Sequence, residues 1–261
     1  MKKTLSTTVT VLALSALTLT GCQSTDSTTA EGDPKLVTSG ELTVCTNSPY
    51  KPFEFEQDGK IVGYDMDIAQ AIADKLKLKL NISNTGFEGL DSGVALSSGQ
   101  CDIAISGITK TEERATKMSF TEPYLNDNLG ILVPKDSTIA NADNLKDQKV
   151  AVQQATSGEK YATEHHADTV QYEDAALMIQ ALQTGQAQAV IANISVISQA
   201  LTSDDSLKLA EEINTHEEIA AAVATDNQKL LDEANNVITT LKEDGELAKL
   251  QEKWLGVSTQ K

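Results

Sequence analysis

The sequence predicts an α/β protein built from parallel-rich sheets with helices on both faces. Short apolar runs typical of buried strands alternate with longer segments whose apolar residues recur at helical spacing. The alternation starts again after Tyr124, so each half of the chain by itself fits one sheet. The two halves hold roughly 220 residues, enough for one large domain or two small lobes.

In the first half, the clearest element is a helix over 64–78, because its apolar residues recur every three or four positions, at Ile68, Ala69, Ile72, Ala73 and Leu76. An Asp-Gly pair at 58–59 marks a hairpin turn. The other expected segments are the strands 42–46, 80–83 and 102–106, the hairpin arms 53–55 and 61–63, and a short helix at 89–98.

The second half repeats the strand and helix pattern. The expected strands are 129–133, 149–153, 170–172, 189–192 and 219–224. The expected helices are 158–164, 175–184, 196–201, 227–241 and 245–255. The last two helices have no strand of their own, so we expect them to pack back onto an existing lobe.

The amino end has the pattern of a bacterial export signal. A basic pair at 2–3 precedes the apolar stretch 9–19, which is shorter than the roughly 20 residues that a membrane-spanning helix needs. The Leu-Thr-Gly-Cys sequence that ends at Cys22 resembles a lipobox, where cleavage precedes the cysteine and its sulfur carries diacylglycerol. We therefore expect 1–21 to be a signal peptide and Cys22 to be lipidated. An ordinary signal peptide with a chance cysteine is the alternative.

The segment after the lipobox is expected to be a flexible tether. Residues 23–35 are rich in Ser, Thr, Asp, Gly and Pro, and they cannot bury enough surface to fold. We assign 22–38 to this lipidated tether. No later stretch is long and apolar enough to span a membrane. The expected location is therefore the extracytoplasmic face of the cell membrane, reached through the lipid anchor.

The charge balance argues against a nucleic-acid partner. The chain holds 21 basic and 38 acidic residues, for a formal net charge of −17. Phosphate contacts require a basic footprint, which this chain lacks. The acidic load fits a solvated surface and identifies no ligand.

Two cysteines remain once Cys22 is assigned to the anchor. Cys45 lies near the end of its expected strand, and Cys101 lies before the start of another. On neighbouring parallel strands this separation exceeds the roughly 7 Å Cα limit for a disulfide. We expect two free, mostly buried thiols, although export permits a disulfide. Without a CxxC motif or a nearby His, neither a metal site nor a cofactor is expected.

The segment 101–114 carries the strongest functional signal. The apolar strand 103–105 ends at Ser106-Gly107, where the backbone turns and exposes N–H groups, and Thr109 adds a hydroxyl. A helix start at 111–113 then places Arg114 in the first turn. Ligands bind beyond the carboxyl ends of strands in open α/β sheets, and a guanidinium suits a carboxylate. The alternative is a surface arginine that opposes the helix dipole.

Several stretches together carry a family resemblance: 46–55 with its Tyr-x-Pro-Phe, 63–69, 102–114, 120–124 and 150–159. Over about 42–256 the chain resembles the extracellular solute-binding proteins of family 3, the polar amino-acid binding proteins of ABC importers. The resemblance implies a periplasmic-binding-protein-like fold of type II, with two α/β lobes, two crossover strands as a hinge, and the ligand between the lobes. The implied lobes are 39–127 with 218–257, and 128–217.

The resemblance also implies ligand contacts from both lobes. Arg114 is expected to bind the ligand α-carboxylate, with Thr109 and the Gly107 amide beside it. Thr156 and Ser157 are expected to contact the same carboxylate from the second lobe.

The side-chain end of the expected site is aromatic and polar. Tyr50 and Phe87 match the positions that sandwich the ligand side chain, with ordinary core packing as the alternative. Asn47 and Ser106, at the ends of their strands, complete the first-lobe contacts.

Two positions that usually carry a carboxylate are neutral here. The family places an Asp where this chain has Asn193, to pair with the ligand ammonium, and Asn47 is the second neutral position. Their neutrality argues against Lys, Arg or ornithine and favours an uncharged, glutamine-like amino acid. We expect an Asp at position 193 to tighten binding of any α-amino acid. The acids that remain as substitutes are Glu173, Asp65 and Asp67.

The resemblance implies a monomeric binding protein that works with an ABC permease and ATPase. No catalytic residue is expected, because no nucleophile, His and acid gather near the carboxylate site. Two alternatives remain open: a ligand-sensing or adhesive lipoprotein with the same fold, and an enzyme similar to cyclohexadienyl dehydratase.

Overall fold

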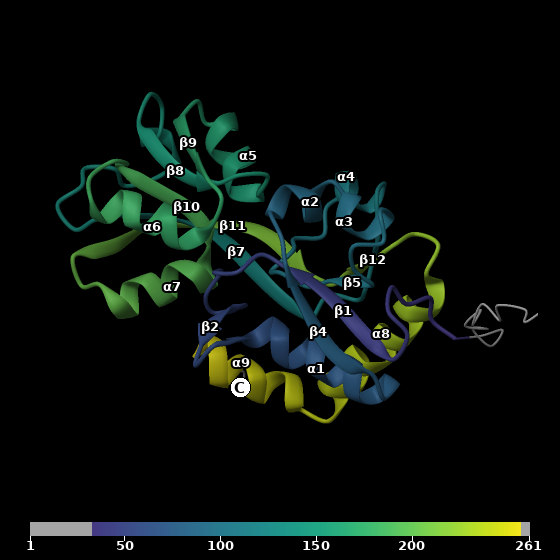
Figure 1. Cartoon of the computed structure of the whole chain (residues 1–261). Helices are drawn as coiled ribbons and strands as arrows, with labels where there is room; N and C mark the ends of the chain where they lie inside the picture. The colour runs from purple at the N-terminus through teal and green to yellow at the C-terminus, as the bar shows by residue number, and fades with distance from the viewer. Residues whose placement is uncertain (1–32, 257–261) are drawn as a thin grey trace, which may run out of the picture.

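The computed structural model describes residues 33–256, which form two α/β lobes lying side by side (Figure 1). The expected signal peptide, Cys22 and most of the expected tether lie outside the described residues, as do 257–261. Each lobe is built around one five-stranded sheet. The predicted two-lobe α/β fold is therefore confirmed. The second half of the chain does not form a sheet entirely by itself, because its strand at 222–223 belongs to the sheet of the first lobe.

The sheet of the first lobe has the strand order β4-β1-β5-β12-β6. Its strands are β1 (Glu41–Thr46), β4 (Lys79–Asn84), β5 (Ile103–Ala104), β6 (Ser119–Phe120) and β12 (Ala222–Val223). Strand β1 runs parallel to β4 and β5, and β12 runs antiparallel to β5 and β6. Strands β2 (Phe55–Gln57) and β3 (Lys60–Val62) form the expected hairpin, with positive φ at Asp58 and Gly59.

Helices cover both faces of this sheet. They are α1 (Tyr64–Leu76), α2 (Phe87–Asp91), α3 (Val94–Ser97), α4 (Glu112–Ala115), α8 (Gln228–Glu243) and α9 (Glu246–Leu255). Val44 and Ile103 share a core with α1 and α8, whereas Cys45 and Ala104 pack with α2 and α3. As expected, α8 and α9 pack back onto this lobe, against α1. The expected helix 89–98 is instead two short helices, since Gly93 takes a φ of 72° between them.

The sheet of the second lobe has the strand order β11-β7-β10-β8-β9. Its strands are β7 (Leu125–Pro134), β8 (Lys149–Gln153), β9 (Asp168–Tyr172), β10 (Ala189–Asn193) and β11 (Leu207–Ile219). The helices are the 3₁₀ turn η1 (Ala142–Asn144), α5 (Ser157–Glu164), α6 (Ala175–Gln183) and α7 (Ile194–Ser203). Helix α5 packs on one face, while α6 and α7 pack on the other.

The two lobes are joined by β7 and β11, which run next to each other as an antiparallel pair (Figure 1). At the first-lobe end, Leu125 pairs with Ile219, and Ile219 also bridges to Thr109. At the far end, Leu207 pairs with Pro134. The pair therefore forms the two crossover strands that the resemblance implied.

Strand β11 is the longest element that the sequence did not predict. Only its end fell inside the expected strand 219–224, which in the structure is the end of β11 followed by β12. Strand β11 lies at the edge of its sheet, and exposed polar and charged residues, Glu212 and Glu218 among them, interrupt its apolar ones. Such strands lack the apolar runs from which the other strands were predicted.

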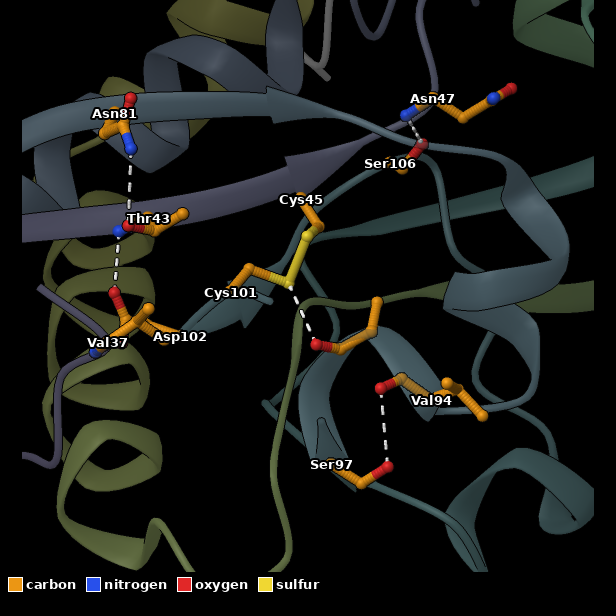
Figure 2. The surroundings of a disulfide bond; sticks show 11 residues. Val37, Thr43, Cys45, Asn47, Asn81, Val94, Ser97, Cys101, Asp102 and Ser106 are labelled. Atoms are coloured by element: carbon orange, nitrogen blue, oxygen red, sulfur yellow. Dashed lines mark hydrogen bonds between the residues drawn. A yellow bond between two sulfur atoms is a disulfide. The ribbon is translucent and has the colours of Figure 1, made fainter. Parts of the chain in front are cut away.

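A disulfide joins Cys45 and Cys101, which corrects the prediction of two free thiols (Figure 2). The prediction placed a strand at 102–106, directly after Cys101, but β5 begins only at Ile103. The chain reaches β5 from α3 through a turn at Gly99, which has a φ of 72°. This route brings the two Cα atoms to 5.7 Å, within the range for a disulfide, on the face of the sheet that packs against α2 and α3.

Replacing both Cys45 and Cys101 with Ala should lower the free energy of unfolding. The bond closes a loop with a sequence separation of 56, for which loop-closure entropy gives about 4 kcal/mol. Urea unfolding of wild type with and without dithiothreitol, beside the double variant, measures the effect. Reductant should destabilise the wild type and leave the double variant unchanged. Equal unfolding free energies for all samples would contradict a stabilising disulfide.

Candidate ligand-binding site between the lobes

The predicted site residues lie at the carboxyl ends of strands from both lobes. Asn47 follows β1 and Ser106 follows β5, while Asn193 ends β10. Such strand ends are where open α/β sheets bind ligands. The structure brings the predicted residues together where the two lobes meet, in neighbouring contacts that we call the interlobe network: Asn47, Tyr50, Phe87, Ser106, Gly107, Thr109, Arg114, Thr156, Ser157 and Asn193.

Arg114 is buried and spans the two lobes, which excludes the alternative of a surface arginine. Thr111 caps α4 by accepting a hydrogen bond from the Arg114 amide. The guanidinium donates to Asp91 at 2.8 Å, to the Thr109 carbonyl at 2.8 Å, and to the Ala155 carbonyl of the second lobe at 2.9 Å. Its carbon lies 5.4 Å from the centre of the Phe87 ring. An arginine has five N–H donors, so donors remain for a ligand carboxylate.

Glu217 is the central site residue that the sequence did not predict. Its Oε2 accepts hydrogen bonds from Thr109 Oγ1 at 2.7 Å, Ser157 Oγ at 3.0 Å and Asn193 Nδ2 at 3.3 Å. The three donors come from both lobes, and all three were predicted to contact the ligand. The sequence signal for Glu217 was an acidic pair just ahead of the apolar run 219–223. Acidic pairs usually lie on solvated surface, so the signal is weak.

Tyr50 closes the site from the first lobe. Its hydroxyl donates to Asn193 Oδ1 at 2.7 Å across the lobes. Its ring stacks on Phe53 at 5.5 Å and packs against Gly107. A Cβ at Gly107 would lie 2.9 Å from the Tyr50 ring, and the φ of Gly107 is +53°, so this position requires glycine. Burial raises the pKa of Tyr50 well above its ordinary value, so the hydroxyl keeps its proton.

An amide pair links the lobes at a neighbouring point. Gln153, which the sequence did not predict, donates from Nε2 to Asn47 Oδ1 at 2.7 Å. The Asn47 backbone N–H donates to Ser106 Oγ at 2.9 Å, and the Asn47 Nδ2 donates to the Thr85 carbonyl at 2.8 Å. Thr156 Oγ1 donates to the Gln153 carbonyl at 2.7 Å. Among the described residues, the buried Gln153 Oε1 has no hydrogen-bond partner.

The Gly107 amide differs from its expected role. It donates to Asp65 Oδ2 at 2.6 Å and so is already bonded within the first lobe. Asp65 also accepts from the Tyr124 hydroxyl at 3.0 Å, and burial raises the pKa of Asp65 to about 7. Asp67 binds Lys253 and the indole N–H of Trp254. Both carboxylates are therefore bonded to groups of the first lobe, and neither forms a hydrogen bond with Asn193 or Glu217.

A second acid lies opposite Glu217. Asp127 on β7 is the direct cross-strand partner of Glu217 on β11. Burial raises the pKa of Asp127 to about 7, against hydrogen bonds from Ser195 and Asn128 that lower it. The Asp127 Oδ2 atom is buried without a hydrogen-bond partner among residues 33–256. The base of the interlobe network is therefore acidic.

The network opens to solvent through a cleft between the lobes. The cleft has a volume of about 460 Å³ and is lined by Asp91, Thr111, Glu113, Arg114, Ala155, Thr156, Ser157, Glu159, Lys160, Thr163 and Glu164. Arg114 and Ser157 thus belong both to the interlobe network and to the wall of this opening.

Residues 42–257 match the family model of the bacterial extracellular solute-binding proteins, family 3. The chain belongs to this family. It is 30% identical over 233 residues to the L-cystine-binding protein TcyJ of Escherichia coli K12, covering 87% of each chain. It is 30% identical over 250 residues to the arginine-binding extracellular protein ArtP of Bacillus subtilis 168, covering 94% of this chain and 95% of ArtP.

A solved structure has a similar fold. An ancestral arginine-binding protein bound to glutamine superposes with a TM-score of 0.79 at 31% identity, over 84% of this chain and all of that chain (100%). The fold is therefore the two-lobe periplasmic-binding-protein fold of type II. Across residues 33–256, no helix has the length and apolar character needed to cross a membrane.

Replacing Arg114 with Ala should weaken ligand binding by about 2–4 kcal/mol, because the ligand carboxylate would be buried without its charged partner. Arg114→Lys should restore binding only in part, since the planar fork of donors is lost. Isothermal titration calorimetry measures both. Lys117→Ala, which removes an exposed cation from the same segment, is the matched control. Wild-type affinity in a folded Arg114→Ala protein would contradict the assignment of Arg114 to the ligand carboxylate.

Asp127 should make stability depend on pH. Because its pKa is about 7 in the folded protein against an ordinary 3.8, the folded state holds this proton more tightly than the unfolded state. Its contribution to stability therefore falls as pH rises from about 4 to about 7. Asp127→Asn should be more stable than wild type at pH 8, by up to about 4 kcal/mol, and this gain should vanish near pH 4. Urea unfolding across this range is the measurement. A pH-independent difference would be inconsistent with a buried, protonated Asp127.

Proposed function

We propose that this protein is the substrate-binding component of an amino-acid ABC importer and captures a polar amino acid between its lobes. The observation that carries the proposal is the buried Arg114, which contacts both lobes and keeps N–H donors for a carboxylate. The family membership and the amino acids named for its relatives support the same conclusion. The closed protein would then present its ligand to a permease and ATPase.

The proposed mechanism is closure of two lobes about the β7 and β11 pair. The proposed lobe boundaries, after Asp127 and before Glu218, fall at a point where Asp127 pairs with Glu217. Rotation at a few residues of such crossover strands is a common hinge motion. Ligand groups that contact both lobes favour the closed form, because they bind it better than the open form. Capture then needs no chemical step, and we propose that the protein binds without turnover.

We propose an uncharged, glutamine-like ligand. The polar side chains that link the lobes beside Arg114 include three amides, Asn47, Gln153 and Asn193. A ligand amide can donate to the unpartnered Gln153 Oε1 without bringing a net charge. The solved relative with glutamine bound shows that this fold accommodates an amide side chain in that protein.

Calorimetry with glutamine, glutamate, cystine, histidine and arginine tests the ligand class. We expect glutamine to bind at least about tenfold more tightly than arginine, which corresponds to about 1.4 kcal/mol. Thermal unfolding gives an independent readout, since a ligand at 100 times its dissociation constant adds about 2.7 kcal/mol. Tight binding of arginine with weak glutamine binding would refute the glutamine-like ligand. If neither these five nor any other common amino acid binds, the proposed function is refuted.

We also propose that a monomeric binding protein is held at the membrane by lipid on Cys22. The short apolar stretch before the lipobox and the polar tether after it support this anchor.

Replacing Cys22 with Ser should remove membrane attachment. The expected product is either a soluble exported protein or an uncut precursor, because the diacylglycerol has no sulfur to join. Membrane fractionation followed by a high-salt wash and immunoblotting distinguishes the wild type from the variant. A Ser variant that still fractionates with washed membranes would show that attachment does not depend on Cys22.

A further inference from the structure

We propose that Glu217 is the acid that binds the ligand α-ammonium, in place of the carboxylate missing at Asn193. This inference rests on the proposed function and names a specificity residue within it. It assigns the charge to a crossover strand, whereas the sequence comparison placed it after β10.

The position of the Glu217 carboxylate carries the proposal. Its Oε2 lies within hydrogen-bond distance of Thr109, Ser157 and Asn193, so it sits where side chains of both lobes converge. Asn193 is the position that carries the ammonium partner in the family pattern. The Glu217 oxygen is 3.3 Å from the Asn193 amide nitrogen, which places the charge beside the expected point.

The lack of a cation near the Glu217 carboxylate, among residues 33–256, is the second argument for this assignment. Glu217 is 9% exposed, and it forms no salt bridge with any Lys, Arg or His within the described residues. A buried carboxylate is stable only when hydrogen bonds and a counter-charge offset its lost hydration. Asp127, its cross-strand partner, adds acid rather than a cation. A ligand ammonium would supply the missing positive charge.

Arg114 and Glu217 together suit a zwitterion, a ligand that carries both a carboxylate and an ammonium. Arg114 offers free N–H donors for a carboxylate, and Thr109 connects the two ends. The Thr109 carbonyl accepts from Arg114, while its hydroxyl donates to Glu217. An α-amino acid carries a carboxylate and an ammonium on one carbon, and so it can reach both charged residues around Thr109.

The position of Glu217 also explains why residue 193 is an amide and not a carboxylate. Its Nδ2 donates to Glu217, and its Oδ1 accepts from Tyr50, so the amide fits both neighbours. An Asp at this position would face the Glu217 carboxylate with no donor between them, and like charges at this distance repel. The expectation that Asn193→Asp tightens binding is therefore reversed: the single variant should bind more weakly.

The experiment moves the negative charge from position 217 to position 193. Wild type, Glu217→Gln, Asn193→Asp and the double variant are compared by calorimetry on the mature, membrane-anchored chain in detergent. The probes are L-glutamine and L-arginine, each with its analogue that lacks the α-amino group, glutaramic acid and 5-guanidinovaleric acid. Glu218→Gln is the matched control, because it removes an adjacent, exposed glutamate.

We expect Glu217→Gln to bind the amino acids about 10–100-fold more weakly, the range of one charge-assisted bond. Its preference for an amino acid over the analogue should fall by the same factor. Asn193→Asp should also lose affinity, and the double variant should recover most of it, since the acid then lies at 193. Glu218→Gln should match the wild type.

Several results would overturn the inference. Unchanged affinity and unchanged preference in Glu217→Gln would show that its carboxylate does not meet the ammonium. Tighter binding by Glu217→Gln would show that the carboxylate competes with that of the ligand. If Glu217→Gln fails to fold, tighter binding by Asn193→Asp alone would overturn the inference. If the wild type binds neither these probes nor any other common amino acid, the proposed function fails, and the assignment of Glu217 fails with it.

Discussion

The antiparallel pairing of β7 with β11 is the constraint on which the rest of the structure depends. These two strands join the lobes, and their ladder fixes which residues face each other at the base of the site. The same ladder places Asp127 opposite Glu217, a pairing of two acids that is unfavourable by itself. Burial keeps the pKa of Asp127 near 7, so this pair need not carry two full charges at neutral pH. Both acids, Asp127 and Glu217, therefore lie on the strands that connect the lobes.

The contacts between the lobes use polar groups that a ligand can also use. Arg114 donates to the Ala155 carbonyl, Tyr50 to Asn193, and Gln153 to Asn47. Glu217 accepts from side chains of both lobes. Hydrogen bonds of this kind contribute little net free energy each, because water replaces them when the lobes separate. A ligand with opposite charges at its two ends can therefore shift the balance between separated and closed lobes.

The part of the site that the sequence predicted best is local in the chain. Ser106, Thr109 and Arg114 lie within nine residues, so a strand end followed by a capped helix start was enough to place them. The residues that sequence reasoning missed, Gln153 and Glu217, take part in the site through contacts with residues far away in the chain. The local sequence around Gln153 and Glu217 does not indicate these contacts.

The elements of the fold also divide into those that local sequence predicts and those that it does not. Strands with apolar runs, such as β8 and β10, were predicted close to their observed bounds, because burial on both faces leaves a clear pattern. The edge strand β11 carries charges and was missed. The disulfide was missed because the strand register was extended past the point where the chain bends into β5. Local pattern predicts elements, whereas register and the route between elements depend on tertiary contacts.

The decisive measurement is a crystal structure of the protein with its bound amino acid. We predict that the ligand carboxylate will bind the Arg114 guanidinium, that the ligand ammonium will lie within hydrogen-bond distance of Glu217 Oε2, and that Thr109 will contact both ends. A ligand carboxylate in the place now held by the Glu217 carboxylate, with Glu217 displaced from Thr109 and Ser157, would contradict it.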